Sequence, residues 1–462
     1  MAKIDNEGKI CWTIPAGINL QELLIKHPPK KFKPIVDHFH YILDYLLRHT
    51  EFQDLDETKG YINLNAQRLQ TYNRKYRYYL EYLMDRGIIR SDNRFIKGEK
   101  SRGYAIREEY LSDTTIDVPA TRFVLSQKVK KDLLAIQKEQ QSTSTLYSFL
   151  TKWFNHYLFI DKAAAIDTIN QLFPIYRNYG AIRGKIKKKY RKTTKRYKAV
   201  QATRMLAEKQ FYYKVDDNIG RFHSNLTNIK KDLRKHITYK GIPLVNIDIA
   251  NAQPLFSALL LKKEFWNGTS AISIKSIPTV KQLFKSNTSY NKTRTSLLTY
   301  ITLVESSENR YHKEFRDYKH MVQNGSFYKM VFENMFPEKE YDKTVIKDVM
   351  FQAFFSANRF IGQPKARLKM MFSHTYPAVY KIFRILKKDN HVILSHLLQR
   401  IESIIMIETV ARRIAVERPE LPFFTIHDSI ATTKGNEQYI KQVMEEEIQR
   451  LTGLCCLVRV EE

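Results

Sequence analysis

Residues 244–254 read Leu-Val-Asn-Ile-Asp-Ile-Ala-Asn-Ala-Gln-Pro, and this stretch decides how the rest of the chain is interpreted. Val245, Ile247 and Ile249 are β-branched, which is typical of a strand, and the strand carries one carboxylate, Asp248. A helix-like apolar run follows directly. Burying an acidic side chain without a counter-charge is costly, and a divalent metal ion would supply that charge. The stretch therefore predicts a strand that presents a metal ligand.

A second stretch, residues 423–430, has the same character and reads Phe-Phe-Thr-Ile-His-Asp-Ser-Ile. Its apolar run predicts another strand, which carries His427 followed by the carboxylate of Asp428. Two strands that each present an aspartate can hold two Mg²⁺ ions, with Mn²⁺ as the alternative metal. In such a pair one ion activates a hydroxyl group and the other stabilises the leaving oxygen. The two stretches together predict in-line phosphoryl transfer.

The chain of 462 residues is strongly basic, with a formal net charge of +29 and a pI near 9.7. This charge is too high for a typical metabolic enzyme and predicts a polyanionic partner, with a solvated basic surface as the alternative. The cysteines are Cys11, Cys455 and Cys456, so we expect neither a zinc site nor a disulfide framework. We find no signal peptide and no apolar run of membrane-spanning length, and we expect a cytoplasmic protein without a membrane partner. The sequence leaves the oligomeric state open.

Residues 36–110 have the pattern of a winged helix-turn-helix module. Apolar residues at helical spacing predict three helices, and short strands follow, the last at residues 103–106. The loop at residues 97–102 is basic and would lie at the wing. We expect this module to dock on DNA through its second and third helices. A small helical packing or protein-interaction module is the alternative, because a fold does not fix a function.

A dense run of lysine and arginine with interleaved tyrosines extends from Arg183 to Lys198. Phosphate contacts from such a segment would be independent of base sequence and sensitive to salt. A solvated helix face is the alternative. The cations at its centre are Lys187, Lys188, Lys189 and Arg191.

A predicted helix over residues 343–356 carries Lys343, Lys347, Phe351 and Phe355, which are four residues apart and share one face. Two cations followed by two aromatic rings fit a nucleoside triphosphate. The cations would hold the phosphates and an aromatic ring would pack on the base or the sugar. The alternative is an amphipathic helix with snorkelling lysines, in which the aromatic side chains belong to the core.

Four stretches in this order resemble the family A nucleic-acid polymerases, which include bacterial DNA polymerase I and the single-subunit phage and mitochondrial RNA polymerases. Residues 220–229 are similar to the family's T-G-R-L-S-S and N-L-Q-N-I block, and residues 248–255 to motif A, D-Y-S-Q-I-E-L-R. The helix 343–356 resembles motif B, R-x-x-x-K-x-x-x-F-G-x-x-Y-G, and residues 427–429 match motif C, H-D-E or H-D-S. The resemblance covers roughly residues 210–440.

The resemblance implies a role for each matched residue. Two metal ions would be held by Asp248, Asp428 and the backbone carbonyl of Ile249. The incoming nucleotide would be bound by Lys343, Lys347, Phe351, Phe355 and Gln253. Contacts to the primer–template would come from Arg221, Asn228, Gln399 and His427. Lys347 would also protonate the leaving pyrophosphate, so that Asp248, Asp428 and Lys347 form the catalytic set.

The chain departs from the family pattern at several positions. Gln253 stands where DNA polymerases carry a glutamate that helps to exclude the 2′-hydroxyl, and Phe355 replaces the tyrosine that helps to select the sugar of the nucleotide. Motif C ends in Ser429, as in the RNA polymerase branch. Further replacements in motif B are Lys343 for arginine, and Gln352 and Ser356 for glycine. The choice between deoxyribose and ribose is therefore open.

The resemblance implies an α+β right-hand polymerase with a thumb, a palm built on an antiparallel sheet and helical fingers, preceded by the winged-helix module. We expect a DNA polymerase without proofreading, acting on a DNA primer–template with nucleoside triphosphates in phage or mobile-element replication. The alternatives are an RNA polymerase, with RNA as a partner, an untemplated nucleotidyltransferase, and a DNA-binding replication protein that does not catalyse. The predicted regions are a leader (1–35), a winged-helix-like domain (36–115), a basic thumb-like region (116–215), a first palm segment (216–260), fingers (261–375) and a second palm segment (376–462).

Overall fold

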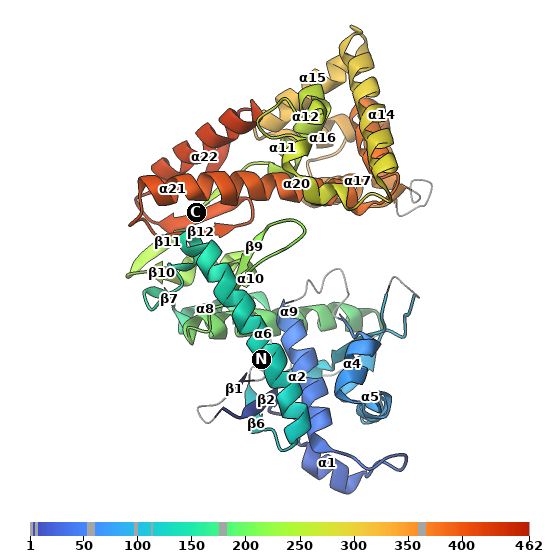
Figure 1. Cartoon of the computed structure of the whole chain (residues 1–462), viewed down its shortest axis with the longest axis vertical. Helices are drawn as coiled ribbons and strands as arrows, with labels where there is room; N and C mark the ends of the chain where they lie inside the picture. Colours follow the sequence, from blue (N-terminus) through green and yellow to red (C-terminus); the bar gives the residue numbers. More distant parts are fainter. Residues whose placement is uncertain are drawn as a thin grey trace. The chain divides into compact units, whose positions relative to one another are not determined.

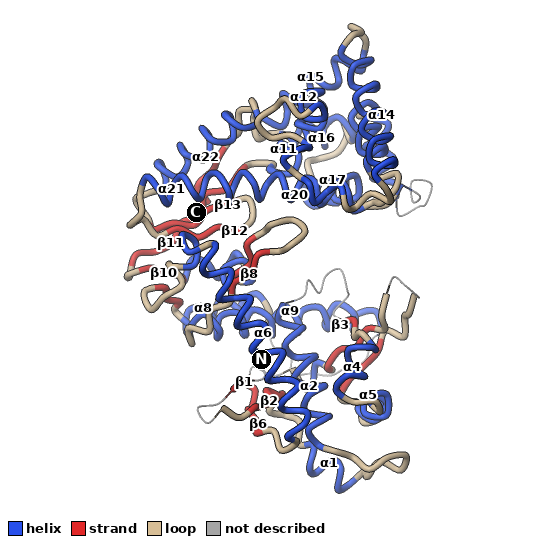
Figure 2. Tube along the Cα trace, in the orientation of Figure 1, coloured by secondary structure: helices blue, strands red, loops and turns tan. Residues whose placement is uncertain are grey.

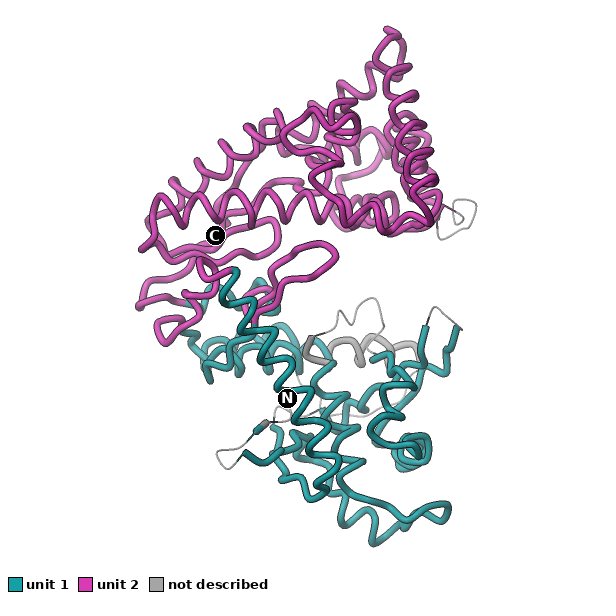
Figure 3. The backbone as a smooth tube through the Cα atoms, viewed as in Figure 1, with its two compact units in different colours: residues 1–146, 159–212, 228–237 teal, residues 147–158, 213–227, 238–462 magenta. Residues whose placement is uncertain are grey.

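A computed structural model describes residues 3–4, 8–52, 61–96, 100–111, 114–174, 183–358 and 366–461. The chain forms two compact units (Figure 3). Unit 1 consists of residues 1–146, 159–212 and 228–237, and unit 2 of residues 147–158, 213–227 and 238–462. Helices and antiparallel sheets occur in both (Figure 2), which confirms the predicted α+β class. Among the helices that the structure describes, none is long and apolar enough to cross a membrane.

Unit 1 is built on a helix that packs against a small antiparallel sheet. The helix is α2 (Val36–Phe52), and the sheet has the order β1 (Lys3–Ile4), β2 (Ile10–Pro15), β6 (Thr115–Pro119). Trp12 of β2 is fully buried in the core. Two buried carboxylates of α2 bind backbone N–H groups: Asp44 accepts from Thr13 at 3.2 Å, and Asp37 accepts from Thr121 at 2.8 Å. These bonds offset the cost of burying the two acids. A short helix, α1 (Leu20–Lys26), precedes α2.

The next elements of unit 1 follow the order predicted for residues 36–110, with one additional strand. They are β3 (Ile62–Asn63), α4 (Ala66–Tyr72), α5 (Tyr76–Asp85), β4 (Ile89–Ser91), β5 (Gly103–Ile106) and the 3₁₀ turn η1 (Glu108–Tyr110). The strands form a sheet in the order β3-β5-β4. Residues 97–99 of the basic loop lie outside the described residues. The assignment as a DNA-binding winged helix stays a prediction.

The remaining elements of unit 1 are mainly long helices: α6 (Phe123–Leu146), α8 (Lys162–Leu172), α9 (Arg183–Ala207) and the 3₁₀ segment η2 (Lys231–His236). The basic run lies in α9. The side chains of its central cations, Lys187, Lys188, Lys189 and Arg191, lie outside the described residues. Tyr197 is buried in the unit 1 core, and Arg196 is buried and donates to Oδ1 of Asn170 at 2.8 Å. These two residues of the run therefore serve packing rather than phosphate contacts.

Unit 2 contains the strand that carries Asp248. The sheet has the order β12 (Phe423–Ile426), β13 (Ser429–Thr433), β11 (Ile242–Ile249), β10 (Ile237–Tyr239), β7 (Leu158–Ile160), and β14 (Val458–Glu461) also pairs with β11. Alternation along β11 places Ile247 and Ile249 on one face, where they are buried, and Asn246 and Asp248 on the other. Helix α22 (Glu437–Thr452) packs against β11, β13 and β14.

Most of unit 2 outside the sheet is helical (Figure 1). Three segments continue one another as a long helix: α20 (Val392–Ser403), the π-helical η7 (Ile404–Ala411) and α21 (Arg412–Glu417). The shorter elements of this part of the chain are α7 (Ser148–Thr151), β8 (Tyr213–Val215), β9 (Phe222–Ser224) and α10 (Asn225–Asn228). Strands β8 and β9 pair with each other, and α7 and β9 contact β12. After β11 come α11 (Ala252–Ser257), η3 (Ala258–Leu261), α12 (Lys263–Asn267), η4 (Ile274–Ser276), α13 (Pro278–Lys281), α14 (Asn287–Glu305), α15 (Arg310–Gln323), α16 (Phe327–Met335), α17 (Lys343–Phe355), α18 (Arg367–Thr375) and α19 (Pro377–Leu386).

Candidate active site

The two predicted aspartates lie at the same end of two paired strands. Strands β11 and β13 are antiparallel, and their register pairs Asp248 with Ser429, the residue after Asp428. The backbone N–H of Ile249 donates to the carbonyl oxygen of Asp428 at 3.4 Å. Directly paired Cα atoms of antiparallel strands are about 4.5–5.5 Å apart. The fold therefore brings the backbones of two aspartates together that are far apart in the sequence.

The expectation of one uninterrupted strand over residues 423–430 is wrong, because Asp428 lies in a turn. His427 and Asp428 form the two-residue connection between β12 and β13, which pair up to Ile426 and Ser429. His427 has a φ of +58°, in the left-handed region that non-glycine residues seldom adopt. A tight hairpin between twisted strands requires such a conformation. The aspartate is thus presented at the tip of a hairpin.

Ser429 braces this hairpin. Its side chain is buried, and its hydroxyl oxygen lies 2.9 Å from both Oδ1 of Asn246 and the carbonyl oxygen of Ile426. The hydroxyl thereby links β13 to β11 across the register. The serine at the end of the motif C match therefore has a structural partner on the neighbouring strand.

Tyr328, in the first turn of α16, lies within electrostatic reach of both aspartates. Burial raises the pKa of its hydroxyl to about 12, and the negative charges of Asp428 and Asp248 contribute to this rise. Two carboxylate charges therefore act on one phenol from the helical side of the site.

A buried carboxylate, Glu402 of α20, is the centre of a second polar group next to Asp428. Its Oε1 lies 2.6 Å from Nη2 and 2.9 Å from Nε of Arg221, and its Oε2 accepts from Nε2 of Gln253 at 2.5 Å. Burial raises the pKa of Glu402, the charge of Arg221 opposes the rise, and the charge of Asp428 adds to it. Glu402, Arg221 and Gln253, which we call the Glu402 cluster, thus join two predicted residues to the neighbourhood of the aspartates.

The loop before Arg221 approaches a second guanidinium closely. Gly220 has a φ of +70°, and a Cβ atom at this position would collide with Nη1 at the end of the Arg400 side chain. Nη2 of Arg400 lies 2.8 Å from a carboxylate oxygen of Glu408. Glycine at 220 therefore satisfies both a left-handed backbone and a lack of space.

The predicted primer–template residues are only partly brought together. The rings of His427 and His223 are 6.0 Å apart between centroids. Gln399 is half-buried on α20, one turn before Glu402. Asn228 is exposed and belongs to unit 1. The roles of Gln399, Asn228 and His427 in nucleic-acid binding stay predictions.

The Lys/Phe stripe of α17 lies on the exposed side of the helix. Lys343 and Lys347 are exposed, Phe351 is 55% exposed, and the rings of Phe351 and Phe355 are 5.1 Å apart between centroids. The opposite side, which includes Phe354, is buried. Helix α17 packs against α16 and α20, the helices that carry Tyr328 and Glu402. The alternative in which the stripe belongs to the core is thus wrong for Phe351.

Two buried lysines fasten the C-terminal end of α17. Nζ of Lys369 donates to Oγ of Ser356 at 2.9 Å and to the carbonyl oxygen of Ala357 at 2.8 Å. Nζ of Lys387 donates to the carbonyl oxygen of Ser356 at 3.2 Å, and burial lowers the pKa of Lys387 to about 7. Cations at this end also complement the helix dipole. Ser356, which replaces a glycine of motif B, is thereby an anchor point.

Two site residues were not identified from the sequence, and each gave a weak signal. Glu402 is a carboxylate inside a strongly apolar helical run, which indicates a buried partner. Tyr328 follows the Asn324–Gly325 turn, and nothing in the surrounding sequence distinguishes it from an aromatic residue of the core. Their positions depend on packing between distant segments, which a local pattern does not report.

The donor set of the aspartate pair fits a hard divalent cation. Asp248 and Asp428 supply carboxylate oxygens, and the backbone carbonyl of Ile249 is adjacent in the chain. Mg²⁺ is typically bound by one or two carboxylates and completes its shell with water and substrate phosphates. Among the described residues, no group of three or more His, Cys, Asp or Glu side chains could form an all-protein cage.

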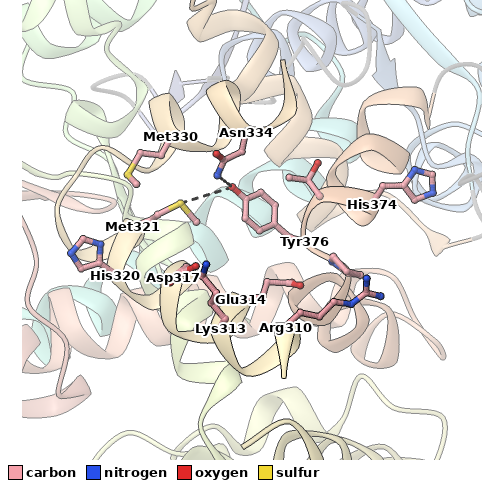
Figure 4. A pocket seen from close by; sticks show the side chains of 12 residues that line it. Arg310, Lys313, Glu314, Asp317, His320, Met321, Met330, Asn334, His374 and Tyr376 are labelled. Carbon is pink, nitrogen blue, oxygen red and sulfur yellow. Dashed lines mark hydrogen bonds between the residues drawn. The ribbon is translucent and has the colours of Figure 1, made fainter. Parts of the chain in front are cut away.

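A cavity of about 470 Å³ lies elsewhere in unit 2, among α15, α16, α18 and the start of α19 (Figure 4). Polar groups at its wall bind one another or the backbone: Tyr376 accepts from Nδ2 of Asn334 at 2.7 Å, and Glu314 accepts from the N–H of Val379 at 2.8 Å, which caps α19. Of the residues predicted for catalysis or binding, none is among the described residues that line this cavity. We therefore place the candidate site at the aspartate pair.

The comparisons with known proteins give distant likenesses in structure and none in sequence. No family model matches the chain, and no curated protein matches its sequence. Among solved structures, the chain is similar to the POL domain of Pol1 from M. smegmatis in complex with DNA primer-template and dNTP, with a TM-score of 0.40 and 10% sequence identity. The similarity covers 73% of this chain and 72% of that chain. A likeness at this level shows neither a family nor an activity.

Proposed function

We propose that the chain is a template-directed nucleic-acid polymerase of the right-hand type, and specifically a DNA polymerase that extends a primer with deoxynucleoside triphosphates. The observation that carries this proposal is the register of β11 and β13, in which Asp248 faces the residue after Asp428. The net charge of +29 supports a nucleic-acid partner. The order of the four motif-like stretches supports the same reading.

Asp248 and Asp428, with the carbonyl of Ile249, would hold the divalent cations. When bound, these ions activate the attacking hydroxyl and stabilise the charge on the leaving oxygen. In the proposed reaction the primer's 3′-hydroxyl loses its proton to water, its oxygen forms a bond to the α-phosphorus, and the bond between that phosphorus and pyrophosphate breaks. The protein itself contributes mainly by positioning the reacting groups.

The exposed stripe of α17 is suited to bind the nucleotide. Lys343 and Lys347 offer two cations one turn apart, and Phe351 offers an exposed ring on the same face. Lys347 would hold the phosphates and give a proton to the leaving pyrophosphate. Phe351 and Phe355 would pack on the base and on the template, because aromatic faces stack on bases of any sequence.

The Glu402 cluster would shape the sugar side of the site. The hydrogen bond to Glu402 turns the amide nitrogen of Gln253 toward the carboxylate. Arg221 is partly exposed beside the same carboxylate, so its free edge could reach the minor groove of the primer–template. The module at residues 36–110 would dock on duplex DNA through α4 and α5.

Primer extension with a labelled DNA primer–template and Mg²⁺ tests the proposal. We would offer dNTPs and NTPs separately to the wild type, to Asp248→Asn and to Asp428→Asn, with Asp317→Asn as a control that removes an exposed carboxylate of α15. We expect template-dependent extension with dNTPs that falls by about three orders of magnitude in the two site variants. Metal-based charge stabilisation is worth several kcal/mol, and each ~1.4 kcal/mol is tenfold in rate.

Extension with NTPs alone would assign the chain to RNA synthesis, and extension without template would assign it to untemplated transfer. Tight DNA binding without extension by either set of nucleotides would refute the catalytic proposal. Equal activity in the wild type and both asparagine variants would refute the assignment of the aspartates.

A further inference from the structure

We propose that Arg459, on the last strand of the chain, binds the phosphate groups of the nucleoside triphosphate at this site. The proposal rests on the proposed function, and it adds a cation that none of the four motif-like stretches contains. The shared chemistry is a phosphate group, which the backbone of the primer–template could also supply.

The register of the sheet puts Arg459 next to Asp248. Strand β14 pairs with β11 on the side away from β13, and Asp248 is the direct partner of Arg459 as it is of Ser429. Side chains of directly paired residues project from the same face, with Cβ atoms about 4.5–5.5 Å apart. Asp248 is thus flanked by the hairpin of Asp428 on one side and by Arg459 on the other.

Hydrogen bonds two residues along the strands show that this face is polar. Nδ2 of Asn246 donates to a carboxylate oxygen of Glu461 at 2.8 Å, and the hydroxyl of Ser429 lies 2.9 Å from Oδ1 of Asn246. Asn246, Ser429 and Glu461 therefore share a face, and the alternation of the strands adds Asp248 and Arg459 to it. The face carries polar groups from three adjacent strands.

The guanidinium of Arg459 is exposed and weakly fixed. Nη2 donates to the carbonyl oxygen of Gly325 at 3.3 Å, at the long end of the hydrogen-bond range. A guanidinium has five N–H donors, so this bond leaves donors for a second acceptor. Gly325 lies in the loop before α16, three residues before Tyr328, whose hydroxyl is influenced by both aspartates.

Gly325 makes this approach of Arg459 to the loop possible. Its φ is +72°, and a Cβ atom here would lie 2.7 Å from Cδ2 of Leu457 and 3.2 Å from Nη2 of Arg459. A side chain at 325 would therefore displace the ends of the Leu457 and Arg459 side chains. Glycine at this position leaves room for the guanidinium beside the loop.

The chemistry of the pair favours an anion as the ligand of Arg459. A guanidinium presents its donors in a fork that matches phosphate oxygens in pairs. Asp248 could neutralise Arg459 without a ligand, and the arginine would then only balance the charge of that carboxylate. A triphosphate that reaches the aspartate pair would come within range of Arg459, since the two residues are cross-strand neighbours.

Steady-state primer extension with Arg459→Ala and Arg459→Lys tests the assignment. Lys434→Ala is the matched control, because Lys434 is an exposed cation just beyond β13 and the register places it about five residues, or ~17 Å, along the strands from Asp248. We expect Arg459→Ala to raise the KM for dNTP at least tenfold with a smaller change in kcat, and Arg459→Lys to recover part of the loss. Lys434→Ala should match the wild type.

Two binding measurements separate the phosphate sources and do not require activity. The first is the shift in melting temperature of the full chain with Mg²⁺ and tripolyphosphate, which we expect in the wild type and in Lys434→Ala but not in Arg459→Ala. The second is the Kd for primer–template, which we expect to stay within twofold. Melting without ligand controls for the fold, and we expect a small change because the side chain is exposed.

An unchanged KM in Arg459→Ala together with a weaker Kd for primer–template would overturn the triphosphate assignment in favour of the nucleic-acid backbone. Identical behaviour of Arg459→Ala and Lys434→Ala in every assay would overturn the site altogether. A wild type that does not extend primers, yet is stabilised by tripolyphosphate through Arg459, would refute the polymerase proposal while supporting this phosphate site.

Discussion

Removing the positive charge of Arg221 tests the Glu402 cluster directly. Arg221→Gln leaves Glu402, which is 2% exposed, with Gln253 as its remaining donor from the cluster. Breaking a buried ion pair by removing one partner costs about 3–5 kcal/mol, because the other charge stays buried. For a unit of this size that corresponds to a loss of roughly 6–20 °C in melting temperature.

The loss should depend on pH, and its sign follows from the pKa of Glu402. Burial and the charge of Asp428 raise this pKa above the unfolded value of about 4.3, and the variant lacks the opposing charge of Arg221. From about pH 4.3 up to the folded pKa, the folded variant binds more protons than the unfolded chain, so its stability falls as pH rises. The slope is at most ~1.4 kcal/mol per pH unit. We therefore expect a larger deficit at pH 8 than at pH 5.

Thermal melting of the wild type, Arg221→Gln and Arg400→Gln at pH 5 and pH 8, with EDTA present, measures this effect. Arg400 is a matched control: its side chain is 19% exposed against 18% for Arg221, but its partner Glu408 is 39% exposed. We expect Arg400→Gln to cost at most about 1 kcal/mol, as half-exposed pairs do. Equal losses in both variants, or a loss in Arg221→Gln that is the same at both pH values, would refute the reasoning.

Three further predictions concern the fold around the site. Lys387→Met should flatten the pH dependence of stability. Burial lowers the pKa of Lys387 to about 7, so the unfolded chain binds more protons than the folded chain up to about pH 10.4. Urea midpoints should therefore show that the wild type gains about 2–3 kcal/mol of stability from pH 7 to pH 9, and that the variant lacks this gain. Gly220→Ala should lower the melting temperature slightly more than Gly241→Ala. Both glycines have positive φ, but a Cβ at 220 forces the end of the Arg400 side chain to move away from its partner Glu408, which costs at most about 1 kcal/mol, whereas a Cβ at 241 meets open space. A larger loss at 241 would contradict the clash with Arg400. Phe354→Ala should lower the free energy of unfolding in urea by about 3–5 kcal/mol, because its side chain is buried. Phe351→Ala should change it by no more than about 0.5 kcal/mol and should raise the KM for dNTP, because its side chain is exposed. A large stability loss at Phe351 would place that side chain in the core.

Local periodicity predicted the elements that carry the chemistry. The β-branched alternation around Asp248 gave the strand β11, and the four-residue spacing of Lys343, Lys347, Phe351 and Phe355 gave the helix α17. The turn at Asp428 was missed because its flanks are apolar on both sides and no glycine or asparagine marks the corner. A positive φ at a histidine is a consequence of the pairing of β12 with β13, and a local pattern contains no such information.

The helical stripe shows what periodicity leaves undetermined. Helix α17 has aromatic residues on both of its sides, and spacing alone cannot tell which side is covered. The buried side is chosen by α16, α18 and α20, which pack against it. Phe354 is covered by these contacts and Phe351 is not. The same spacing was therefore compatible with a core stripe and with an exposed one, and only the tertiary contacts distinguish them.

Charge balance gives the two arginines near the aspartates different tasks. Nη2 and Nε of Arg221 both lie against Oε1 of Glu402, so its charge is matched by a carboxylate that is almost fully buried. Arg459 is exposed, and the register pairs it with Asp248, whose carboxylate belongs to the proposed reaction centre. Breaking a buried ion pair lowers the free energy of unfolding, whereas removing an exposed cation weakens the binding of an anionic ligand. Substitution of Arg221 should therefore mainly lower stability, and substitution of Arg459 should mainly raise the KM for dNTP. A reversal of these two patterns would mean that the cluster, and not the sheet edge, contacts the phosphates.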